Sequence, residues 1–395
     1  MFNLSDFLKD KLRESSQHFQ VALQLLDLTP RKIKRILGAG YAMYRGTEWA
    51  KKPLFLHIEP TGVCNLKCIM CPRTESIIRE MRHMKFEKFE TICDAIEPIF
   101  IAFAGFGEPL LNPQIIDMVR YSVKKDITTR ISSNATVLNP KLSREIIRTK
   151  LHQIWFSIDS PNAENFERLR IGADFNKTIA AIKEFAAIRD EEKSEIIITI
   201  NFTIIKENVH EVPEMVRFCH NKLNLMPTFA RGYGYDIADQ RVRILKNSQE
   251  IQSSLREGAR IAHEYRLFEV ERNLKTIIKD LEDPLDGRGP CYFPYYAVAV
   301  SWDGKVSPCC LFYDYQMELG DLSTTPFEEI WNGRTYQSFR MNLKRQRRKI
   351  DICNTCLLND ISLNNIMHKI SRLPGAKFFT KERYKYIYRG INQKI

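Results

Sequence analysis

Three cysteines early in the chain, Cys64, Cys68 and Cys71, stand at C-x3-C-x2-C spacing. Three thiolates at this spacing can ligate three irons of a four-iron cluster and leave the fourth iron open. A cluster with four cysteine ligands serves mainly in electron transfer, whereas an open iron can bind a substrate or cofactor and take part in its chemistry. The spacing therefore predicts an enzyme.

Zinc ligation, a bacterial-ferredoxin-like run and three structural thiols are the competing interpretations of these cysteines. A structural zinc is usually closed by four ligands, and no fourth ligand lies close by in the sequence. The cysteines also follow a short apolar run, 54–61, that ends in turn residues. The cluster loop is therefore expected to follow a strand.

A second group of cysteines lies in the last third of the chain. A segment with the alternation of a hairpin, 297–308, contains an Asp-Gly turn at Asp303. A helical segment follows Trp331 and leads to a C-x2-C pair. The hairpin and the helix are expected to bring distant cysteines together.

Length and composition suit a protein of the cytoplasm. The sequence has 395 residues, enough for a domain of barrel size and a smaller one. Ten cysteines without a signal peptide indicate a reducing compartment and metal ligation. Two of them, Cys93 and Cys219, fall in expected helices and are interpreted as buried structural thiols. No window is long and apolar enough for a transmembrane helix.

The formal net charge of +12 is concentrated near the ends of the sequence, at 31–35, 344–349 and 369–389. A solvated basic surface explains this distribution as well as attraction to an anionic partner does. That partner would be a phosphorylated substrate, a membrane surface bound peripherally, or RNA. The tail segment 378–389 interleaves aromatic and cationic residues, as interfacial segments and docking helices both can.

Short β-rich runs alternate with helical stretches from residue 54 to about residue 230. This alternation predicts an α/β fold, an open (β/α)6 parallel barrel. Because chemistry in parallel barrels collects at the carboxyl ends of strands, site residues are expected in the loops that follow each run. The six expected strands are 54–61, 100–103, 128–131, 154–158, 196–205 and 225–230.

The chain is expected to divide into four parts. Residues 1–50 form a helical, amphipathic amino-terminal extension with a break at Pro30, and residues 51–282 hold the barrel and a charged helical region. A change of composition begins a small α+β domain, 283–360. A basic, aromatic tail, 361–395, completes the chain.

The cluster loop and the segment 104–111 resemble the radical S-adenosylmethionine superfamily, whose core is a partial barrel. The resemblance implies a 4Fe-4S cluster at the three early cysteines and S-adenosylmethionine as cofactor. It also implies that Gly105, Gly107 and Glu108 correspond to the GGE-type motif, which accepts hydrogen bonds from the methionyl ammonium of the cofactor. Glycine permits close approach of the backbone, and Glu108 supplies the complementary charge.

The same resemblance extends to later strand ends. Ser133 and Asn134 follow the third strand, and Ser157 begins an S-x-D segment whose serine contacts the cofactor in related enzymes. Arg170 matches an arginine placed on the cofactor carboxylate, and Met70 stands in the cluster loop where many members carry an aromatic residue. Hydroxyl and amide residues at loop starts also serve as helix caps, which leaves a structural alternative open.

The second cysteine group resembles the SPASM and twitch auxiliary domains of radical S-adenosylmethionine enzymes. The shared features are a glycine five residues before a cysteine and the sequence motif Leu-Gly-Asp-Leu at 319–322, which is followed by Ile-Trp-Asn at 330–332. The cysteines are too few for two auxiliary clusters, so one second 4Fe-4S cluster is expected. Cys310 could replace Cys309, and a structural zinc is the alternative metal. The implied ligands are Cys291, Cys309, Cys353 and Cys356.

The resemblance implies reductive cleavage of S-adenosylmethionine and removal of a hydrogen atom from a substrate. With an intact auxiliary cluster as electron acceptor, oxidation or bond formation is the expected reaction. An epimerase or a group transferase is the alternative, with Cys310 as a candidate hydrogen donor. The expected partners are a small-molecule or peptide substrate, anionic or membrane-associated, and a reductant of flavodoxin or ferredoxin type.

A different class of protein is a non-enzymatic iron-sulfur or zinc module that binds RNA through its basic tail. Such a module has no use for the Gly107-Glu108 pair, so nucleic acid is not the expected partner.

Overall fold

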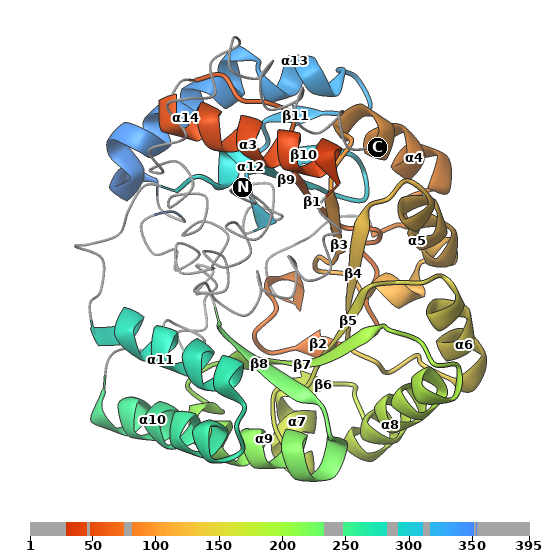
Figure 1. The fold of residues 1–395 in the computed structure, drawn as a ribbon, viewed down its shortest axis with the longest axis vertical. Coiled ribbons are helices and arrows are strands. Elements are labelled where there is room, and N and C mark those ends of the chain that lie inside the picture. The colour runs from red at the N-terminus through yellow and green to blue at the C-terminus, as the bar shows by residue number, and fades with distance from the viewer. Residues whose placement is uncertain are drawn as a thin grey trace, which may run out of the picture.

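A central nine-stranded sheet organises the structure, a computed structural model that describes residues 29–45, 48–74, 81–232, 248–282, 291–310, 317–350 and 353. Its strand order is β11-β10-β9-β1-β3-β4-β5-β7-β8 (Figure 1). Six strands are parallel to their neighbours: β1 (Phe55–Ile58), β3 (Phe100–Phe103), β4 (Thr128–Ser133), β5 (Gln153–Ser157), β7 (Ile197–Ile204) and β8 (Met226–Arg231). They confirm the six expected strands.

Helices cover the outer face of the parallel strands (Figure 1). Outward-facing residues such as Ile58, Phe103 and Ile131 are fully buried against them. Between the strands lie α4 (Phe86–Ile96), η2 (Pro109–Leu111), α5 (Ile115–Lys124), α6 (Pro140–Arg148), α7 (Ala163–Leu169), α8 (Phe175–Glu191), η3 (Val209–Glu211), α9 (Val212–Phe218) and the π-helical turn η4 (Cys219–Leu223). The sheet does not close, because β8 and β11 remain edge strands in the described part of the chain.

The carboxyl-terminal strands join the same sheet as the barrel. β9 (Ala297–Val300) pairs in parallel with β1, with Ala299 opposite His57. β10 (Lys305–Ser307) pairs antiparallel with β9, which confirms the predicted hairpin, and β11 (Gly320–Asp321) pairs with β10. The turn of the hairpin requires Gly304, whose φ is +95°.

Buried polar contacts attach the carboxyl-terminal helices to the segment before β1. Trp331 Nε1 donates to the Lys51 carbonyl at 2.8 Å, and Asn332 exchanges two hydrogen bonds of 3.0 Å with the Ala50 backbone. Arg340 donates to the Glu48 carbonyl at 2.9 Å. The carboxyl-terminal helices are α12 (Phe293–Tyr296), α13 (Phe327–Trp331), α14 (Arg334–Gln346) and the following turn η7 (Arg347–Lys349).

The remaining described helices match the expectations. Helix α3 (Pro30–Arg45) begins at the proline expected to interrupt the amino-terminal helical region. Helices α10 (Gln249–Glu264) and α11 (Phe268–Glu282) form the expected charged helical region. No described helix is long and apolar enough to span a membrane. Residues 1–28, the boundary at 283–290 and the tail after 353 lie outside the described residues.

Candidate active site

Cys64 lies in the loop between β1 and the two-residue strand β2 (Lys67–Cys68), Cys68 ends β2, and Cys71 directly precedes the turn η1 (Pro72–Thr74). Their thiols are half-buried. Burial raises the pKa of all three, that of Cys71 to about 12, so the free thiols are protonated at neutral pH. Metal ligation here must displace protons. No group of three His, Cys, Asp or Glu side chains among the described residues could hold a single metal ion. The ligands of a cluster bind different irons and therefore stand further apart than the ligands of one ion.

The loop after β4 holds the amino-terminal side of the cluster loop. Asn134 Nδ2 donates to Asn65 Oδ1 at 3.0 Å and lies 3.9 Å from Cys64 Sγ. Asn65 in turn donates to the Thr136 hydroxyl at 2.8 Å. An N–H group directed at a cluster sulfur is one means by which proteins set cluster potentials, so Asn134 suits a cluster-bound Cys64.

Arg170 is brought to the middle cysteine by a small antiparallel sheet. Strand β6 (Arg170–Ile171) pairs with β2 in the register Arg170 opposite Cys68. Arg170 Nη1 lies 3.9 Å from Cys68 Sγ, and its Nε donates to Asp159 Oδ2 at 2.7 Å. Burial opposes the charge of Arg170, but the neighbouring carboxylate of Asp159 outweighs it and raises the pKa. The pair places a fixed cation beside the cluster loop.

The loop after β3 packs directly against the cluster loop. Glu108 is 2% exposed, and its two carboxylate oxygens accept the backbone N–H groups of Leu110 at 3.0 Å and Asn134 at 2.7 Å. Burial raises the pKa of Glu108, and these two hydrogen bonds counteract it. The Ser133 hydroxyl is a third hydrogen-bond partner of Glu108. The two carboxylate oxygens have about four lone pairs in total, so capacity for a further donor remains. Glu108 therefore ties two strand ends together and can still accept a hydrogen bond.

Both glycines of the loop occupy positions without space for a side chain. A Cβ on Gly107 would lie 1.9 Å from the Thr61 carbonyl oxygen. A Cβ on Gly105 would lie 2.5 Å from the Glu59 side chain. At both positions the absence of a side chain lets the loop backbone lie close to the segment that follows β1.

The other sequence-predicted site residues lie at the same end of the sheet. Ser133 accepts a hydrogen bond from the Ala135 N–H at 3.0 Å, which supports its structural alternative as a turn residue. Ser157 ends β5 half-buried, and its hydroxyl has no hydrogen-bond partner among the described residues. Met70 is half-buried within the cluster loop.

Two residues without an assigned role in the sequence also organise the site. Glu59, 1% exposed, accepts the Phe106 N–H at 2.9 Å and so holds the glycine loop. The Thr61 hydroxyl accepts the Val63 N–H at 3.0 Å and lies 2.8 Å from His83 Nδ1. Their position in the sequence, directly after the first strand, could have identified them, because functional residues of parallel barrels lie at the carboxyl ends of strands.

Three of the carboxyl-terminal cysteines, Cys291, Cys309 and Cys310, lie near Tyr296, and Cys353 lies near Cys291. Burial raises the pKa of Cys353 to about 12, with a contribution from the neighbouring thiol of Cys291. Burial and the adjacent thiols of Cys291, Cys310 and Cys309 raise the pKa of Tyr296. Cys356 lies outside the described residues. The structure thus brings together three of the four implied ligands and the alternative ligand Cys310.

A cation lies in the interior of the barrel, near Cys310 of the second cysteine group. The Arg130 guanidinium, on β4, stacks 3.8 Å from the Trp155 ring centroid and 5.6 Å from that of Phe100. Burial lowers the pKa of Arg130 to about 10, and the Cys310 thiol counteracts this effect. Burial and the charge of Arg130 lower the pKa of His57 to about 3, so this histidine is neutral.

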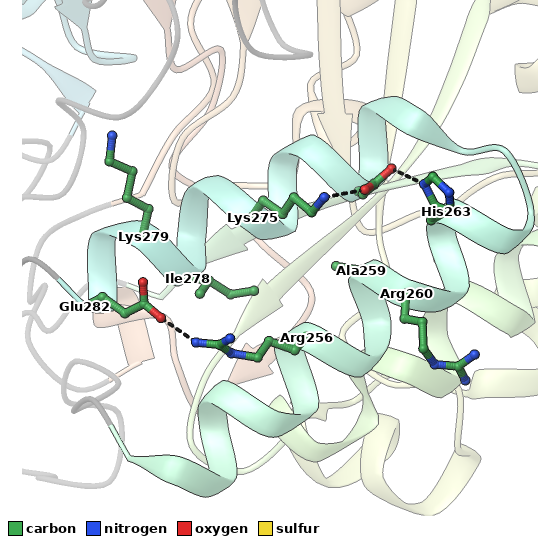
Figure 2. Close-up of a pocket in the computed structure, with 9 residues that line it drawn as sticks. Arg256, Ala259, Arg260, His263, Lys275, Ile278, Lys279 and Glu282 are labelled. Carbon is green, nitrogen blue, oxygen red and sulfur yellow. Dashed lines mark hydrogen bonds and ion pairs between the residues drawn. The ribbon is translucent and has the colours of Figure 1, made fainter.

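A separate groove of about 610 Å³ lies between α10 and α11 (Figure 2). Ion pairs within it join Arg256 to Glu282 and Lys275 to Glu271, both at 2.5 Å, and His263 Nδ1 lies 2.9 Å from Glu271. The groove contains no thiol. We therefore assign the chemistry to the cysteine loops.

Comparison with known proteins supports this assignment. The Radical SAM superfamily model matches residues 58–219, and a model of the SPASM iron-sulfur cluster-binding domain matches residues 291–357. The tungsten-containing aldehyde ferredoxin oxidoreductase cofactor-modifying protein of Pyrococcus furiosus is 27% identical over 334 residues, covering 78% of this chain and 88% of that protein. The AdoMet-dependent heme synthase of Methanosarcina barkeri is 26% identical over 333 residues, covering 76% and 88%.

Solved structures share the fold. SuiB of Streptococcus suis bound to the precursor peptide SuiA has a TM-score of 0.57 at 19% identity, covering 90% of this chain and 83% of that chain. The parallel sheet, the cluster loop and the two family matches show that the chain belongs to the radical S-adenosylmethionine superfamily and carries a SPASM-type carboxyl-terminal region. It is an enzyme with S-adenosylmethionine, a 4Fe-4S cluster and an auxiliary iron-sulfur cluster as cofactors.

Proposed function

We propose that this enzyme cleaves S-adenosylmethionine at a cluster ligated by Cys64, Cys68 and Cys71 and oxidises an organic substrate or forms a bond in it. The observation that supports this most is the convergence of the three thiols with Glu108 and Arg170 at the carboxyl ends of the parallel strands. When bound, the cluster supplies the electron that cleaves the cofactor to methionine and a radical that removes a substrate hydrogen.

The residues around the cluster bind and orient the cofactor in this proposal. Gly105 and Gly107 let the backbone approach it, and Glu108 accepts a hydrogen bond from its ammonium. Ser157 has a hydroxyl available for the cofactor, and Met70 lines its site from the cluster loop. Three predicted contacts remain. Arg170 lies near the Cys68 sulfur, Asn134 lies near the Cys64 sulfur, and Ser133 directly precedes Asn134.

The auxiliary cluster is proposed to accept the electron that oxidation releases. Its proposed ligands are Cys291, Cys309, Cys353 and Cys356. The interaction of Arg130 with Cys310 supports this arrangement, because it links the second cysteine group to the interior of the barrel.

The test is formation of 5′-deoxyadenosine by the anaerobically reconstituted, reduced protein with S-adenosylmethionine, compared with Cys71→Ala at matched iron content of the auxiliary site. Product from the wild type alone is the expected result. Absence of product from wild-type protein that carries both clusters contradicts the proposal.

Epimerisation is the second candidate, and the position of Cys310 near the barrel interior favours it. Cys310→Ala leaves an oxidation intact. If Cys310→Ala loses net turnover but still cleaves the cofactor, Cys310 is the hydrogen donor and the reaction is an epimerisation.

We propose an organic small molecule or a peptide as substrate, because the names of the similar proteins include both. SuiB binds a precursor peptide, whereas the Pyrococcus furiosus and Methanosarcina barkeri proteins are a cofactor-modifying protein and a heme synthase. The proposed reductant is an acidic flavodoxin- or ferredoxin-type protein. The exposed cations Arg345 and Lys349, on the helical segment that leads to Cys353, offer it a basic docking surface.

A further inference from the structure

Arg130 is an inward-facing residue of a barrel strand. Its neighbour Ile131 is fully buried on the outer face, and side chains alternate between the faces of a strand. The guanidinium lies over the Trp155 ring at 3.8 Å and near the Phe100 ring at 5.6 Å. Two aromatic side chains from the adjacent strands thus fix its orientation.

The charge of Arg130 has no counter-charge within the described residues. No described Asp or Glu forms an ion pair with it, and its buried Nε has no hydrogen-bond partner there. The neighbouring His57 is neutral. Arg130 is half-buried, and withdrawing a cation from water without an anion costs free energy that a ligand of opposite charge would offset.

The location of Arg130 suits a substrate. Three residues further along β4, Ser133 begins the loop that contacts Glu108 and Cys64 through Asn134. The electrostatic interaction of Arg130 with Cys310 places it toward the second cysteine group as well. A molecule held by Arg130 would lie inside the barrel between the two proposed clusters.

We propose that Arg130 is the anchor for a carboxylate of the substrate, with Trp155 and Phe100 contacting an apolar or aromatic part of the same molecule. The planar guanidinium matches a carboxylate through two parallel hydrogen bonds, which a rigid, ring-stacked arginine is oriented to make. This inference rests on the proposed function, because it assigns the substrate class of that same site.

Isothermal titration calorimetry on the anaerobic, cluster-loaded protein tests the assignment with 3-phenylpropionate as probe. The controls are 3-phenylpropionamide, which has the same ring without the charge, and phenyl phosphate, which has a different anion. The wild type is expected to bind the acid at least about tenfold more tightly than the amide or the phosphate. Arg130→Gln is expected to lose at least about tenfold in affinity for the acid, and Arg130→Lys is expected to lose less.

Arg120→Gln is the matched control, since it makes the same chemical change at an exposed surface ion pair with Asp117. It should bind the acid as the wild type does. Iron content and thermal unfolding establish that each variant is folded and loaded. Equal binding of the acid by wild type and Arg130→Gln overturns the proposal, as does absence of binding or preference for phenyl phosphate in the wild type. Binding needs no radical chemistry, so this outcome is distinguishable from a failure of the proposed function.

Discussion

Single charged residues connect the loops of the proposed cofactor site. Asp159 accepts hydrogen bonds from Arg170 Nε and from the Thr203 backbone N–H, both at 2.7 Å, and is fully buried. Glu108 and Glu59 use their carboxylates in the same way on other strand ends. Each carboxylate replaces water as the partner of N–H groups that the loops leave unpaired.

We predict that Asp159→Asn loosens the loop around Cys68. The amide has only one acceptor oxygen, so its NH₂ group faces at least one of the N–H donors that now bond to Asp159. The substitution also removes the negative charge that neutralises the buried Arg170. Loss of one partner of a buried ion pair typically costs about 3 to 5 kcal/mol. Denaturant titration should show a fall of this order in the free energy of unfolding, with lower iron content at the first site.

Asp117→Asn provides the comparison for this prediction. Asp117 pairs with Arg120 at 3.3 Å, and both side chains are more than half exposed. Exposed pairs contribute only about 0 to 1 kcal/mol. Equal losses of stability in the two variants would show that the Asp159 contact does not contribute as described.

Gly107→Ala is expected to lower 5′-deoxyadenosine formation by about a hundredfold, the order found when catalytic groups are displaced by about 1 Å. The new Cβ cannot lie 1.9 Å from the Thr61 carbonyl, so the glycine loop must move away from the cluster loop. Gly38→Ala is the control, because its Cβ would find Lys51 Cγ at an ordinary 3.7 Å. Wild-type rates in Gly107→Ala would contradict a cofactor role for this loop.

At the scale of elements, one arginine joins the carboxyl-terminal helices to the barrel. Arg340 is fully buried between the rings of Trp331 and Tyr336, each centroid 4.4 Å from its guanidinium carbon. It donates to the carbonyls of Pro294 and Glu48, each at 2.9 Å. Its side chain therefore connects α14 with α12 and with the segment before β1.

Arg340→Met should lower the free energy of unfolding by about 2 to 4 kcal/mol, because two carbonyls lose their charged donor and two rings lose the cation. Chemical denaturation followed by tryptophan fluorescence measures the change. Arg334→Met, at the exposed start of the same helix, should change stability by less than about 0.5 kcal/mol. A similar loss of stability in both variants would show that the buried contacts of Arg340 do not account for its contribution to the free energy of unfolding.

The elements of the barrel could be predicted from the sequence because each strand is short, apolar and bounded by turn residues. The run at 100–103, for example, coincides with β3. The Asp-Gly turn identified the β9–β10 hairpin, and the C-x3-C-x2-C spacing identified the cluster loop. Each of these patterns lies within a few consecutive residues, so it can be recognised without knowledge of the tertiary structure. The functional roles of the site residues and the domain boundaries remain predictions.

Long-range pairing could not be predicted in the same way. No local pattern indicates that Ala299 lies opposite His57, or that Arg170 pairs with Asp159 as well as approaching Cys68. Arg130 was assigned only to a strand, because its significance depends on rings contributed by two other strands. Spatial relations of this kind arise from the tertiary fold.

At the scale of the whole molecule, the net charge of +12 predicts salt-dependent coupling to an acidic protein reductant. Turnover supported by flavodoxin should fall about tenfold from low ionic strength to about 0.5 M salt, whereas turnover supported by dithionite should change little. The double variant Arg345→Glu with Lys349→Glu should weaken the salt dependence, and Lys177→Glu, on the exposed surface of α8, is the control. Salt dependence that is unchanged in the double variant would exclude this docking surface.

The pairing of β9 with β1 also has a consequence for how the protein forms during synthesis. The first barrel strand leaves the ribosome long before its neighbour β9, since α4 to α11 are encoded between them. Until β9 arrives, one edge of β1, next to the cluster loop, has unpaired backbone groups that can recruit another chain. Such non-local pairing is slow to form and exposes the nascent chain to aggregation. Completion of this edge is therefore a late event in folding, and chaperones or iron-sulfur carrier proteins have the whole interval of translation in which to reach the immature cysteine loop.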